Sequence, residues 1–501
     1  MLLRIRRSSC LVLVAAVSLI MHAKGLSSPL LDYHYHRQCN TAAIARNYHE
    51  NGLRLLQPQI DWDGANRGRA ATEFPLFMWL IGLFWPVAGL AELWGRVLAA
   101  AFSALTAVYL FLLLEDDLGR DIALFAGTLF SFIPLEIFFG RTVQPEALAL
   151  CATVAALYHW RRALGPKRPW THWLAATLSA FLAVSHKLPY AYVFAPLGWL
   201  AWERLGRAAC KDLRSWAALG LAAGGVLAWY AYASAGVYVV PTSSLSQFLN
   251  ILEYRRLPYY VQFQLLSRFP ELAATHAGVL FAGVGAWLLV GRERRMFYAV
   301  WFISVLASIV AGGGYTFHHE YTSLPFAPIN AAFMAAGLRL LFMRINSLAP
   351  AWRPWARCAL AALTLSMPVY SLARIRHWYR INHPFLTRAA AVADRVSAPD
   401  DLFLCNERAA SVFLFYLRRR GWRLAFPDDE PGAREQLEIR IRQGAKFFAT
   451  EKAGAFRDPA TDIARRFYAR FPVVWDADGL LIFRLQEQPS SKSRPPLVIN
   501  S

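Results

Sequence analysis

The sequence predicts an α-helical polytopic membrane protein with about eleven transmembrane helices, followed by a C-terminal extracytoplasmic α/β domain. Hydrophobic residues make up 56% of the 501-residue chain and charged residues only 17%, whereas soluble domains carry about a quarter charged residues. The mean hydropathy is +0.30. Apolar runs of about twenty residues, long enough to cross a bilayer as a helix, recur throughout residues 1–375.

The first apolar run, residues 9–21, comes directly after Arg4, Arg6 and Arg7. This order is typical of a secretory signal, but no small-x-small cleavage site comes after it, so we expect an uncleaved anchor. Ten further predicted spans share its apolar character and lie near residues 95–114, 122–139, 146–160, 171–185, 188–202, 216–236, 272–290, 296–312, 322–343 and 357–373.

The Lys and Arg residues of the short loops predict the orientation. With a cytoplasmic N-terminus, the inner segments hold nineteen of them and the outer segments after the first loop hold five. This asymmetry satisfies the positive-inside rule. We therefore expect a multi-pass plasma membrane protein, in a bacterium an inner-membrane protein, that contacts membrane lipids. Most of the net charge of +20 then fixes orientation, and nucleic acid is not needed as a partner to explain it.

The predicted transmembrane domain, residues 1–375, includes one long outer loop, residues 22–94. This loop contains an aromatic-rich run at 74–90 that is broken by Pro75 and Pro86. A transmembrane helix there would invert every later loop, so we expect a helix in the membrane surface.

A soluble α/β domain is predicted for residues 376–488, because short apolar runs alternate with helical segments there. Residues 489–501 are expected to be disordered. The predicted strands cover residues 401–405, 423–426, 446–450, 473–475 and 480–485, and the predicted helices cover residues 409–420, 434–443 and 461–471.

Polar residues gather in outer segments that are far apart in the sequence. Ionisable groups at a membrane are expensive, so their placement points to function. With the predicted topology, five clusters lie at one membrane face: residues 32–38, 72–76, 140–146, 185–190 and 312–321. Together they offer carboxylates for acid–base work, cations for an anion and aromatic rings for a sugar.

These motifs resemble the polytopic glycosyltransferases that use a lipid-phosphate sugar donor, namely the protein O-mannosyltransferase and aminoarabinose transferase type with the GT-C fold. The resemblance is clearest over residues 22–200. It depends on Asp32 before an Ala-rich helix at 40–51, Glu-Phe-Pro-Leu from Glu73, Arg-x-x-x-Pro-Glu from Arg141 and Lys-x-Pro from Lys187. One departure is Tyr33, which stands where protein mannosyltransferases have a second acid.

The resemblance implies that an acceptor hydroxyl of an envelope glycan, lipid or protein attacks the anomeric carbon of a sugar on a polyprenyl phosphate, with inversion. A hydroxyl needs a positioned base. Asp32, at the exit of the first span, is the expected base; the alternative is an exposed cap for the helix that comes after it.

The departing phosphate needs cations, because it gathers negative charge. Arg141 and Lys187 are the only Lys or Arg in their short outer turns, so we expect them at the phosphate with His186 as a helper. Snorkelling to lipid head groups is the alternative for both. Arg37 is a further candidate, unless it pairs with an acid on its own helix.

Sugar or acceptor contacts are expected from Glu73, His318, His319, Glu320 and Tyr321. Glu73 could instead orient a cation, whereas Glu146, at a helix start, is interpreted as a structural cap. No cofactor is firmly predicted. A divalent metal stays an alternative, because His34 and His36 could meet residues 318–320.

The main rival function is a transporter or lipid flippase of glycoconjugates. Such proteins place ionisable residues at mid-membrane on broken helices. The predicted spans here are nearly free of charge and the polar groups lie at one face, which favours chemistry there.

Overall fold

The computed structural model describes residues 6–66, 68–70, 73–88, 91–235, 256–290, 296–408, 411–426 and 431–486. It divides the chain into two compact units. The helical unit comprises Met1–Ser28 and Ala71–Arg380, and the α/β unit comprises Pro29–Ala70 and Ile381–Ser501. The predicted disorder of residues 489–501 falls outside the described residues.

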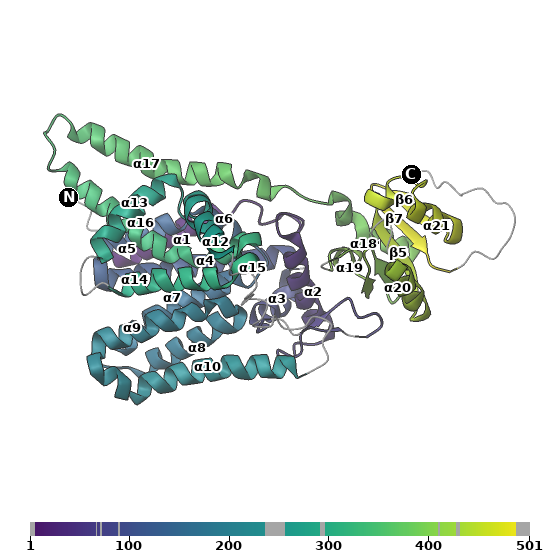
Figure 1. The fold of residues 1–501 in the computed structure, drawn as a ribbon, viewed down its shortest axis with the longest axis horizontal. Coiled ribbons are helices and arrows are strands. Elements are labelled where there is room, and N and C mark those ends of the chain that lie inside the picture. Colours follow the sequence, from purple (N-terminus) through teal and green to yellow (C-terminus); the bar gives the residue numbers. More distant parts are fainter. Residues whose placement is uncertain are drawn as a thin grey trace. The chain divides into compact units, whose positions relative to one another are not determined.

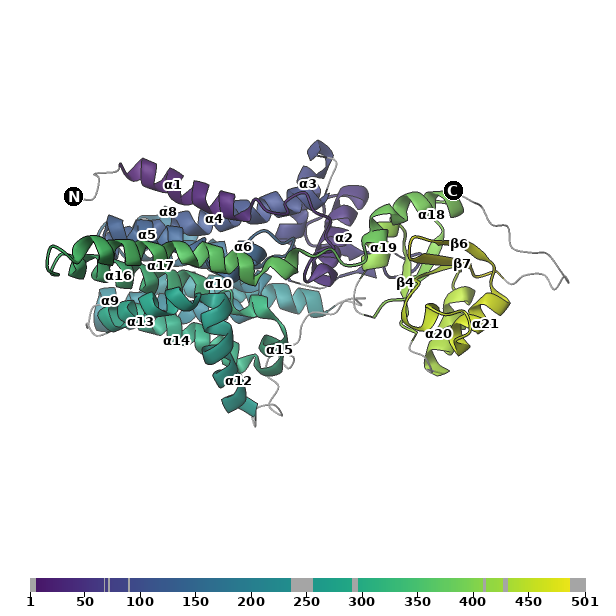
Figure 2. The same cartoon turned by 90° about the horizontal axis from the view of Figure 1, so that it is seen from above.

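The helical unit is a bundle of mostly long, roughly antiparallel helices (Figures 1 and 2). Each of the eleven predicted apolar runs contains at least one helix. The helices are α1 Arg7–His22, α3 Leu76–Ala88, α4 Ala91–Leu118, α5 Arg120–Phe130, α6 Pro134–Phe139, α7 Glu146–Ala163, α8 Trp170–His186, α9 Phe194–Leu205, α10 Leu213–Ser234, α12 Leu257–Phe263, α13 His276–Val290, α14 Met296–Ala311, α15 Gly313–His318, α16 Phe326–Ile345 and α17 Arg353–Arg374.

Within the described residues, four helices are long and apolar enough to cross a membrane, and a bent pair over residues 258–289 would make a fifth. The chain therefore has the character of a membrane protein, while the count of about eleven spans stays a prediction. The predicted span 122–139 is interrupted between α5 and α6. Pro134 begins α6, and a residue before proline avoids the helical conformation, which explains the break.

Helices α13 and α16 approach each other closely at two glycines. A Cβ atom on Gly285 would lie 1.8 Å from the carbonyl oxygen of Phe333, and one on Gly337 would lie 1.9 Å from that of Phe281. Only glycine fits such backbone contacts, and small residues at helix interfaces are typical of packing in membranes.

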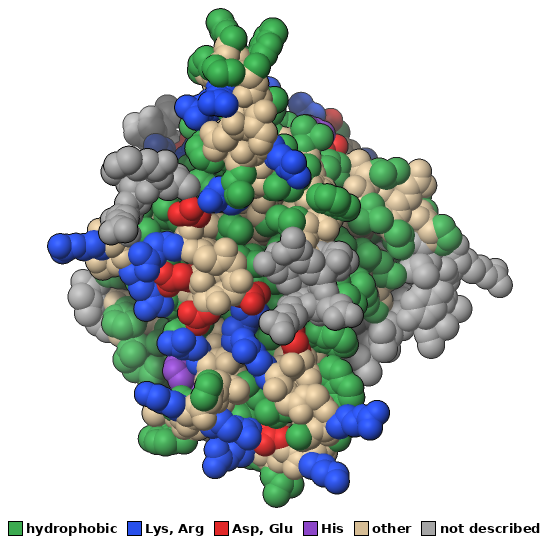
Figure 3. All heavy atoms as spheres, turned by 90° about the vertical axis from the view of Figure 1, so that its left-hand side faces the viewer, with side chains coloured by type: hydrophobic (Ala, Val, Ile, Leu, Met, Phe, Trp, Pro, Cys, Tyr) green, Lys and Arg blue, Asp and Glu red, His purple; other side chains and the backbone are tan. Residues whose placement is uncertain are grey.

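Basic side chains gather at the end of the helical unit that Figure 3 faces, among exposed hydrophobic side chains. The turns from α9 to α10 and from α16 to α17 lie at this end (Figure 1). Their exposed residues include Arg207, Lys211 and Trp352. Basic and aromatic residues together are typical of a membrane–water boundary. These two turns, both predicted to face the cytoplasm, thus share one end, and the side of the membrane stays a prediction.

The α/β unit contains a five-stranded sheet in the order β4-β3-β5-β7-β6. Its strands are β3 Leu402–Cys405, β4 Gly421–Arg423, β5 Ala445–Glu451, β6 Val473–Ala477 and β7 Leu480–Arg484. Strand β3 is parallel to β4 and β5, whereas β7 is antiparallel to β5 and β6. Four predicted strands coincide with observed ones, but the run at 423–426 is wrong by about two residues because Gly421 starts the pairing opposite Phe403.

Helices α18 (Ala389–Val396) and α19 (Val412–Leu417) lie on one side of this sheet, and α20 (Pro431–Arg442) and α21 (Asp462–Arg470) lie on the other (Figure 2). The core beneath α20 and α21 is aromatic, with Phe448, Phe467 and Phe483 in mutual ring contact.

The two units divide the chain differently from the predicted domains 1–375 and 376–488. Residues 29–70, part of the predicted outer loop 22–94, belong to the α/β unit. They include α2 (Tyr35–Asn51) and the short pair β1 (Gln59–Ile60) and β2 (Gly68–Arg69). Buried Arg46 of α2 donates to Asp61 Oδ2 at 2.7 Å and to the carbonyl oxygen of Phe415 at 2.8 Å. Residues 29–70 join the α/β unit through contacts with distant parts of the chain, so no local change in composition marks the boundary at residue 29 or at residue 70.

Candidate functional site

Lys187 stands at the centre of a polar cluster in the helical unit. Helix α8 ends at His186, and Lys187 adopts an extended conformation before the 3₁₀ turn Leu188–Val193. Its Nζ atom lies 2.7 Å from Oε1 of Glu73 and 3.0 Å from Oε1 of Glu146. A single ammonium thus joins two carboxylates from segments far apart in the sequence.

Local structure places both carboxylates beside this lysine. Glu146 is the first residue of α7 and directly follows Pro145, which is a favoured way to start a helix. Glu73 precedes α3, and the N–H of the next residue, Phe74, donates to the carbonyl oxygen of Ser185 at 2.9 Å. That bond ties the Glu73 segment to the end of α8.

The cluster is largely removed from solvent. The side chain of Glu146 is 1% exposed, that of Lys187 11% and that of Glu73 16%. Charges in such surroundings interact strongly and need partners. The interpretation of Glu146 as a cap was therefore incomplete, because its carboxylate also holds Lys187. Glu73 pairs with the Lys187 ammonium, and its two alternative roles, holding the acceptor or orienting a cation, stay predictions.

The segment 315–321 lies beside the same lysine. The Lys187 ammonium is 5.7 Å from the centre of the Tyr321 ring. The Tyr321 hydroxyl is 3.0 Å from that of Tyr315, and the ring of His319 stacks on Tyr321 with centroids 5.2 Å apart. His318 is exposed at the end of α15, and its ring contacts Phe317. The structure thus brings Tyr321 and His319, but not His318, into this contact chain.

Arg268 is a buried cation that the sequence marks only as an outer basic residue. It lies in a π-helical stretch, Gln264–Ala273, and is 4% exposed. Its guanidinium donates to the carbonyl oxygens of Thr316 at 2.5 Å and Phe317 at 2.8 Å, and lies 3.8 Å from Glu320 Oε1. Arg268 therefore holds the segment that carries Tyr321. It also gives the carboxylate of Glu320 a partner of opposite charge.

Arg141 is fully buried in an aromatic cage. Its guanidinium carbon lies 4.7 Å from the ring centre of Phe138 and 4.5 Å from that of Tyr379. One N–H donates to the carbonyl oxygen of Gly25 at 3.2 Å. A guanidinium commonly packs on ring faces in this way. This burial argues against the snorkelling alternative for Arg141.

Aromatic rings connect the Arg141 cage with the Lys187 cluster. Trp378 contacts Phe138 and Phe139, at 5.2 and 5.5 Å between ring centres, and Phe139 contacts Tyr321 at 5.8 Å. His186 is buried, and its Nδ1 atom donates to the carbonyl oxygen of Leu182 at 2.8 Å. Four of the five predicted clusters, all of those in the helical unit, are thus connected through contacts.

Asp32 and Arg37 belong to the α/β unit. Asp32 is 1% exposed, and its Oδ1 accepts a hydrogen bond of 2.6 Å from Gln38 Nε2. The interpretation of Asp32 as an exposed cap is therefore wrong. Arg37 is half-buried in the first turn of α2.

A hydrogen-bonded chain lies in the same segment of the α/β unit. The Tyr35 hydroxyl is 3.1 Å from His383 Nε2, and His383 Nδ1 is 2.9 Å from Glu451 Oε2. Asn382, next to His383, donates its backbone N–H to the carbonyl oxygen of Leu31. This backbone hydrogen bond joins Asn382 to Leu31, so it lies one residue before His383 and one residue before Asp32 in the sequence.

Burial lowers the pKa of His36, and the charges of His383 and His34 lower it further. Among the described residues, no group of three or more His, Cys, Asp or Glu side chains is arranged to hold a metal ion. The metal alternative stays a prediction.

Comparisons with known proteins agree with this architecture. Residues 72–232, about a third of the chain, match the family described as dolichyl-phosphate-mannose-protein mannosyltransferase. No curated protein matches the chain in sequence. Among solved structures, ArnT from Cupriavidus metallidurans bound to undecaprenyl phosphate superposes with a TM-score of 0.63 at 13% identity, covering 97% of this chain and 100% of ArnT.

Two further solved structures have the same fold. The Archaeoglobus fulgidus oligosaccharyltransferase tethered with an acceptor peptide gives a TM-score of 0.59 at 11% identity, over 96% of this chain and 74% of that protein. The arabinofuranosyltransferase AftD from Mycobacteria gives 0.52 at 13% identity, over 97% and 40%. The predicted resemblance is confirmed: the chain has the GT-C fold of these membrane glycosyltransferases, and its residues 72–232 match the protein mannosyltransferase family.

Proposed function

We propose that this protein is an integral-membrane glycosyltransferase that transfers a sugar from a polyprenyl phosphate to a hydroxyl group. The acceptor is an envelope glycan, lipid or protein, and the transfer takes place at the outer face of the plasma membrane. The observation that carries the proposal is the buried cluster of Lys187, Glu73, Glu146 and Tyr321. It lies in a chain with the fold of ArnT, which has been crystallised with undecaprenyl phosphate.

In the proposed reaction the acceptor oxygen forms a bond to the anomeric carbon as the bond from that carbon to the phosphate oxygen breaks. The acceptor proton passes to a base, the polyprenyl phosphate leaves with the electron pair, and the anomeric configuration inverts. Two groups are therefore required: a proton acceptor, and a cation that stabilises the phosphate.

Lys187 is the proposed cation for the phosphate. Its ammonium is already held in place, which reduces the reorganisation needed when charge develops. A phosphate oxygen would take over one carboxylate contact. Glu73 is the more exposed partner, at 16% against 1% for Glu146, so we expect Glu73 to give way while Glu146 keeps the ammonium in place.

Other residues take supporting roles in the proposal. Arg141, His186 and Arg37 stay candidates for the phosphate. His319, Glu320 and Tyr321, with the exposed His318, are candidates for the sugar, because tyrosine and histidine rings present both a flat apolar face and a polar edge. Asp32 stays the proposed base; its hydrogen bond from Gln38 supports it by fixing the orientation of the carboxylate.

The test is an assay of the purified protein in detergent, with polyprenyl-phosphate sugars and, as a control, nucleotide sugars of the same sugars. We expect polyprenyl phosphate to be released from the lipid donors and no nucleotide to be released. Detergent micelles do not separate two compartments, and a transporter or flippase does not cleave the bond between sugar and phosphate. Such a protein would therefore release no polyprenyl phosphate. Absence of release from every lipid donor would contradict the proposal.

A further inference from the structure

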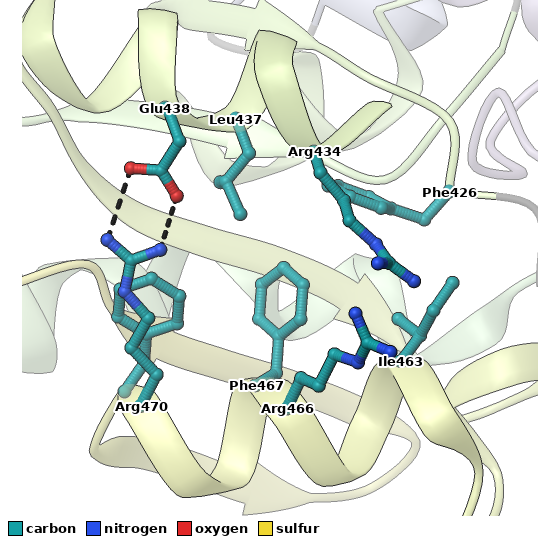
Figure 4. Close-up of a pocket in the computed structure, with 9 residues that line it drawn as sticks. Phe426, Arg434, Leu437, Glu438, Ile463, Arg466, Phe467 and Arg470 are labelled. Carbon is teal, nitrogen blue, oxygen red and sulfur yellow. Dashed lines mark hydrogen bonds and ion pairs between the residues drawn. The ribbon is translucent and has the colours of Figure 1, made fainter. Parts of the chain in front are cut away.

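The α/β unit contains a pocket between helices α20 and α21, on the side of the sheet that these helices cover (Figure 4). Its volume is about 250 Å³. Sites for drug-sized ligands usually measure about 300–1,000 Å³, so this pocket suits a single ring with its substituents.

The inner wall of the pocket is apolar and partly aromatic. The ring of Phe467 points into the pocket from α21, and Leu437 faces it from α20 (Figure 4). Phe467 contacts Phe426 edge to face, with centroids 5.4 Å apart, which fixes its orientation. Phe467 is 5% exposed and its ring also packs on Phe448 and Phe483, so only a small part of it, together with Leu437, faces the pocket as an apolar surface for the C–H hydrogens of a sugar ring.

At one end of the pocket the described residues carry a surplus of positive charge. Arg434 from α20 and Arg466 from α21 bring their guanidinium groups toward each other there (Figure 4). Both pair with Asp462, at 3.5 and 2.8 Å, and the same carboxylate also pairs with Arg465 at 2.9 Å. Three guanidinium groups thus surround one carboxylate.

The other end of the pocket is neutral. Arg470 and Glu438 form a two-point ion pair across the gap between the helices (Figure 4). Its charges cancel, so among the described residues that line the pocket the surplus at the Asp462 end is not compensated. A guanidinium has five N–H donors in a planar fork, and the contact with Asp462 uses only part of that capacity.

We infer that this pocket binds an anionic sugar residue of the acceptor. The apolar face of the sugar ring packs on Phe467, and its carboxylate or phosphate group lies between Arg434 and Arg466. The assignment to the acceptor rests on the proposed glycosyltransferase function, whereas binding of an anionic sugar does not. The pocket is too small for a peptide segment, and its apolar wall gives a sugar an advantage over a bare anion.

Binding to the purified full-length protein, measured by titration calorimetry, tests this inference. The probes are glucuronic acid, glucose 6-phosphate, neutral glucose and inorganic phosphate. We expect both anionic sugars to bind at least tenfold more tightly than glucose and than inorganic phosphate. Equal binding of glucose and the anionic sugars would overturn the inference, as would equal binding of inorganic phosphate and glucose 6-phosphate.

Neighbouring arginines provide a matched pair of variants. Arg466→Gln removes a pocket guanidinium, whereas Arg465→Gln removes the same charge from the same carboxylate outside the pocket lining. We expect Arg466→Gln to weaken binding of the anionic sugars at least fivefold and Arg465→Gln to leave it within twofold. Equal effects of the two variants would overturn the inference. Both side chains are exposed, and circular dichroism and gel filtration check that each variant is folded.

This experiment measures binding without turnover, so its outcome is independent of the proposed function. If polyprenyl phosphate is never released but anionic sugars bind as expected, the proposed function fails and the pocket assignment stands. If release occurs while no anionic sugar binds, the pocket assignment fails and the proposed function stands.

Discussion

The ammonium nitrogen of Lys187 lies 3.0 Å from Oε1 of Glu146, whose side chain is almost completely buried. A buried charge is tolerated only with a partner, so each residue requires the other. Glu73 adds a second carboxylate at 2.7 Å, and the position of the ammonium is therefore determined from two directions. In the proposed reaction this arrangement holds a cation where the phosphate of the donor departs.

Replacement of Lys187 by Met should affect both stability and donor use. Loss of one partner of a buried ion pair costs about 3–5 kcal/mol, because Glu146 is left buried and charged. The double variant Lys187→Met with Glu146→Gln removes both charges and should recover most of that loss in thermal unfolding. Its apparent KM for the lipid donor should nevertheless rise at least tenfold, with little change for the acceptor. A wild-type KM for the donor in a stable double variant would exclude Lys187 from the phosphate.

Asp32→Asn should abolish transfer while leaving the protein folded. An asparagine keeps the oxygen that accepts the hydrogen bond from Gln38, but it takes up no proton. We expect at least a hundredfold lower turnover with an unchanged unfolding temperature.

The matched control is Asp61→Asn in the same unit. Asp61 is buried and accepts hydrogen bonds from Arg46 and Asn47, so removal of its charge should lower the free energy of unfolding by about 3 kcal/mol. Near wild-type turnover by Asp32→Asn would remove Asp32 from the mechanism.

Arg268→Gln should loosen the segment 313–323. A hydrogen bond to a charged group contributes about 1.5–3 kcal/mol, and Arg268 donates two of them to this segment, at Thr316 and Phe317. We expect faster hydrogen–deuterium exchange in these residues by mass spectrometry. Arg374→Gln is the control, because Arg374 pairs with Glu271, in the same π-helical stretch as Arg268, but is more exposed. Equal exchange in both variants would refute the assigned role.

The stability of the α/β unit should fall as the pH rises, because of Glu407. Burial raises the pKa of Glu407 to about 8, although the N–H groups of Phe413 and Val412 donate to its carboxylate. A carboxyl group with a raised folded pKa contributes stability that is complete below its unfolded pKa of about 4.3 and is lost as the pH passes through the folded value.

Thermal unfolding between pH 5 and pH 9 measures this dependence. Glu407→Gln should lose part of the pH dependence of the wild type, with the difference developing between about 4.3 and about 8. Identical pH profiles for the two proteins would contradict the raised pKa.

The sequence alone predicted the helices of the first unit well, because apolar runs of sufficient length leave few alternatives in a membrane protein. It also predicted most strands of the α/β unit, where apolar runs such as 446–450 alternate with amphipathic helices. It did not predict that residues 29–70 belong to the α/β unit. The contacts responsible, such as the hydrogen bond from Gly64 N to the carbonyl oxygen of Gly421, join positions more than three hundred residues apart and leave no local pattern.

The candidate site shows the same limit. The residue types and the segments that carry them were predictable, because ionisable groups next to apolar runs stand out. The pairing of Lys187 with Glu73 and Glu146 was not predictable from the sequence. Each of these residues could pair with several residues of opposite charge that are predicted to lie at a similar depth in the membrane. Arg268 was missed because its partners are backbone carbonyl groups, which carry no sequence signal.

The most direct test of the central claim is a mass balance on the purified wild-type protein in detergent, with an isotope-labelled sugar on polyprenyl phosphate and a mixture of envelope glycans, lipids and peptides as acceptors. We expect polyprenyl phosphate and a new labelled glycoside to appear in equal amounts, and neither to appear with Asp32→Asn. Intact donor after prolonged incubation with every acceptor would contradict the proposed transfer.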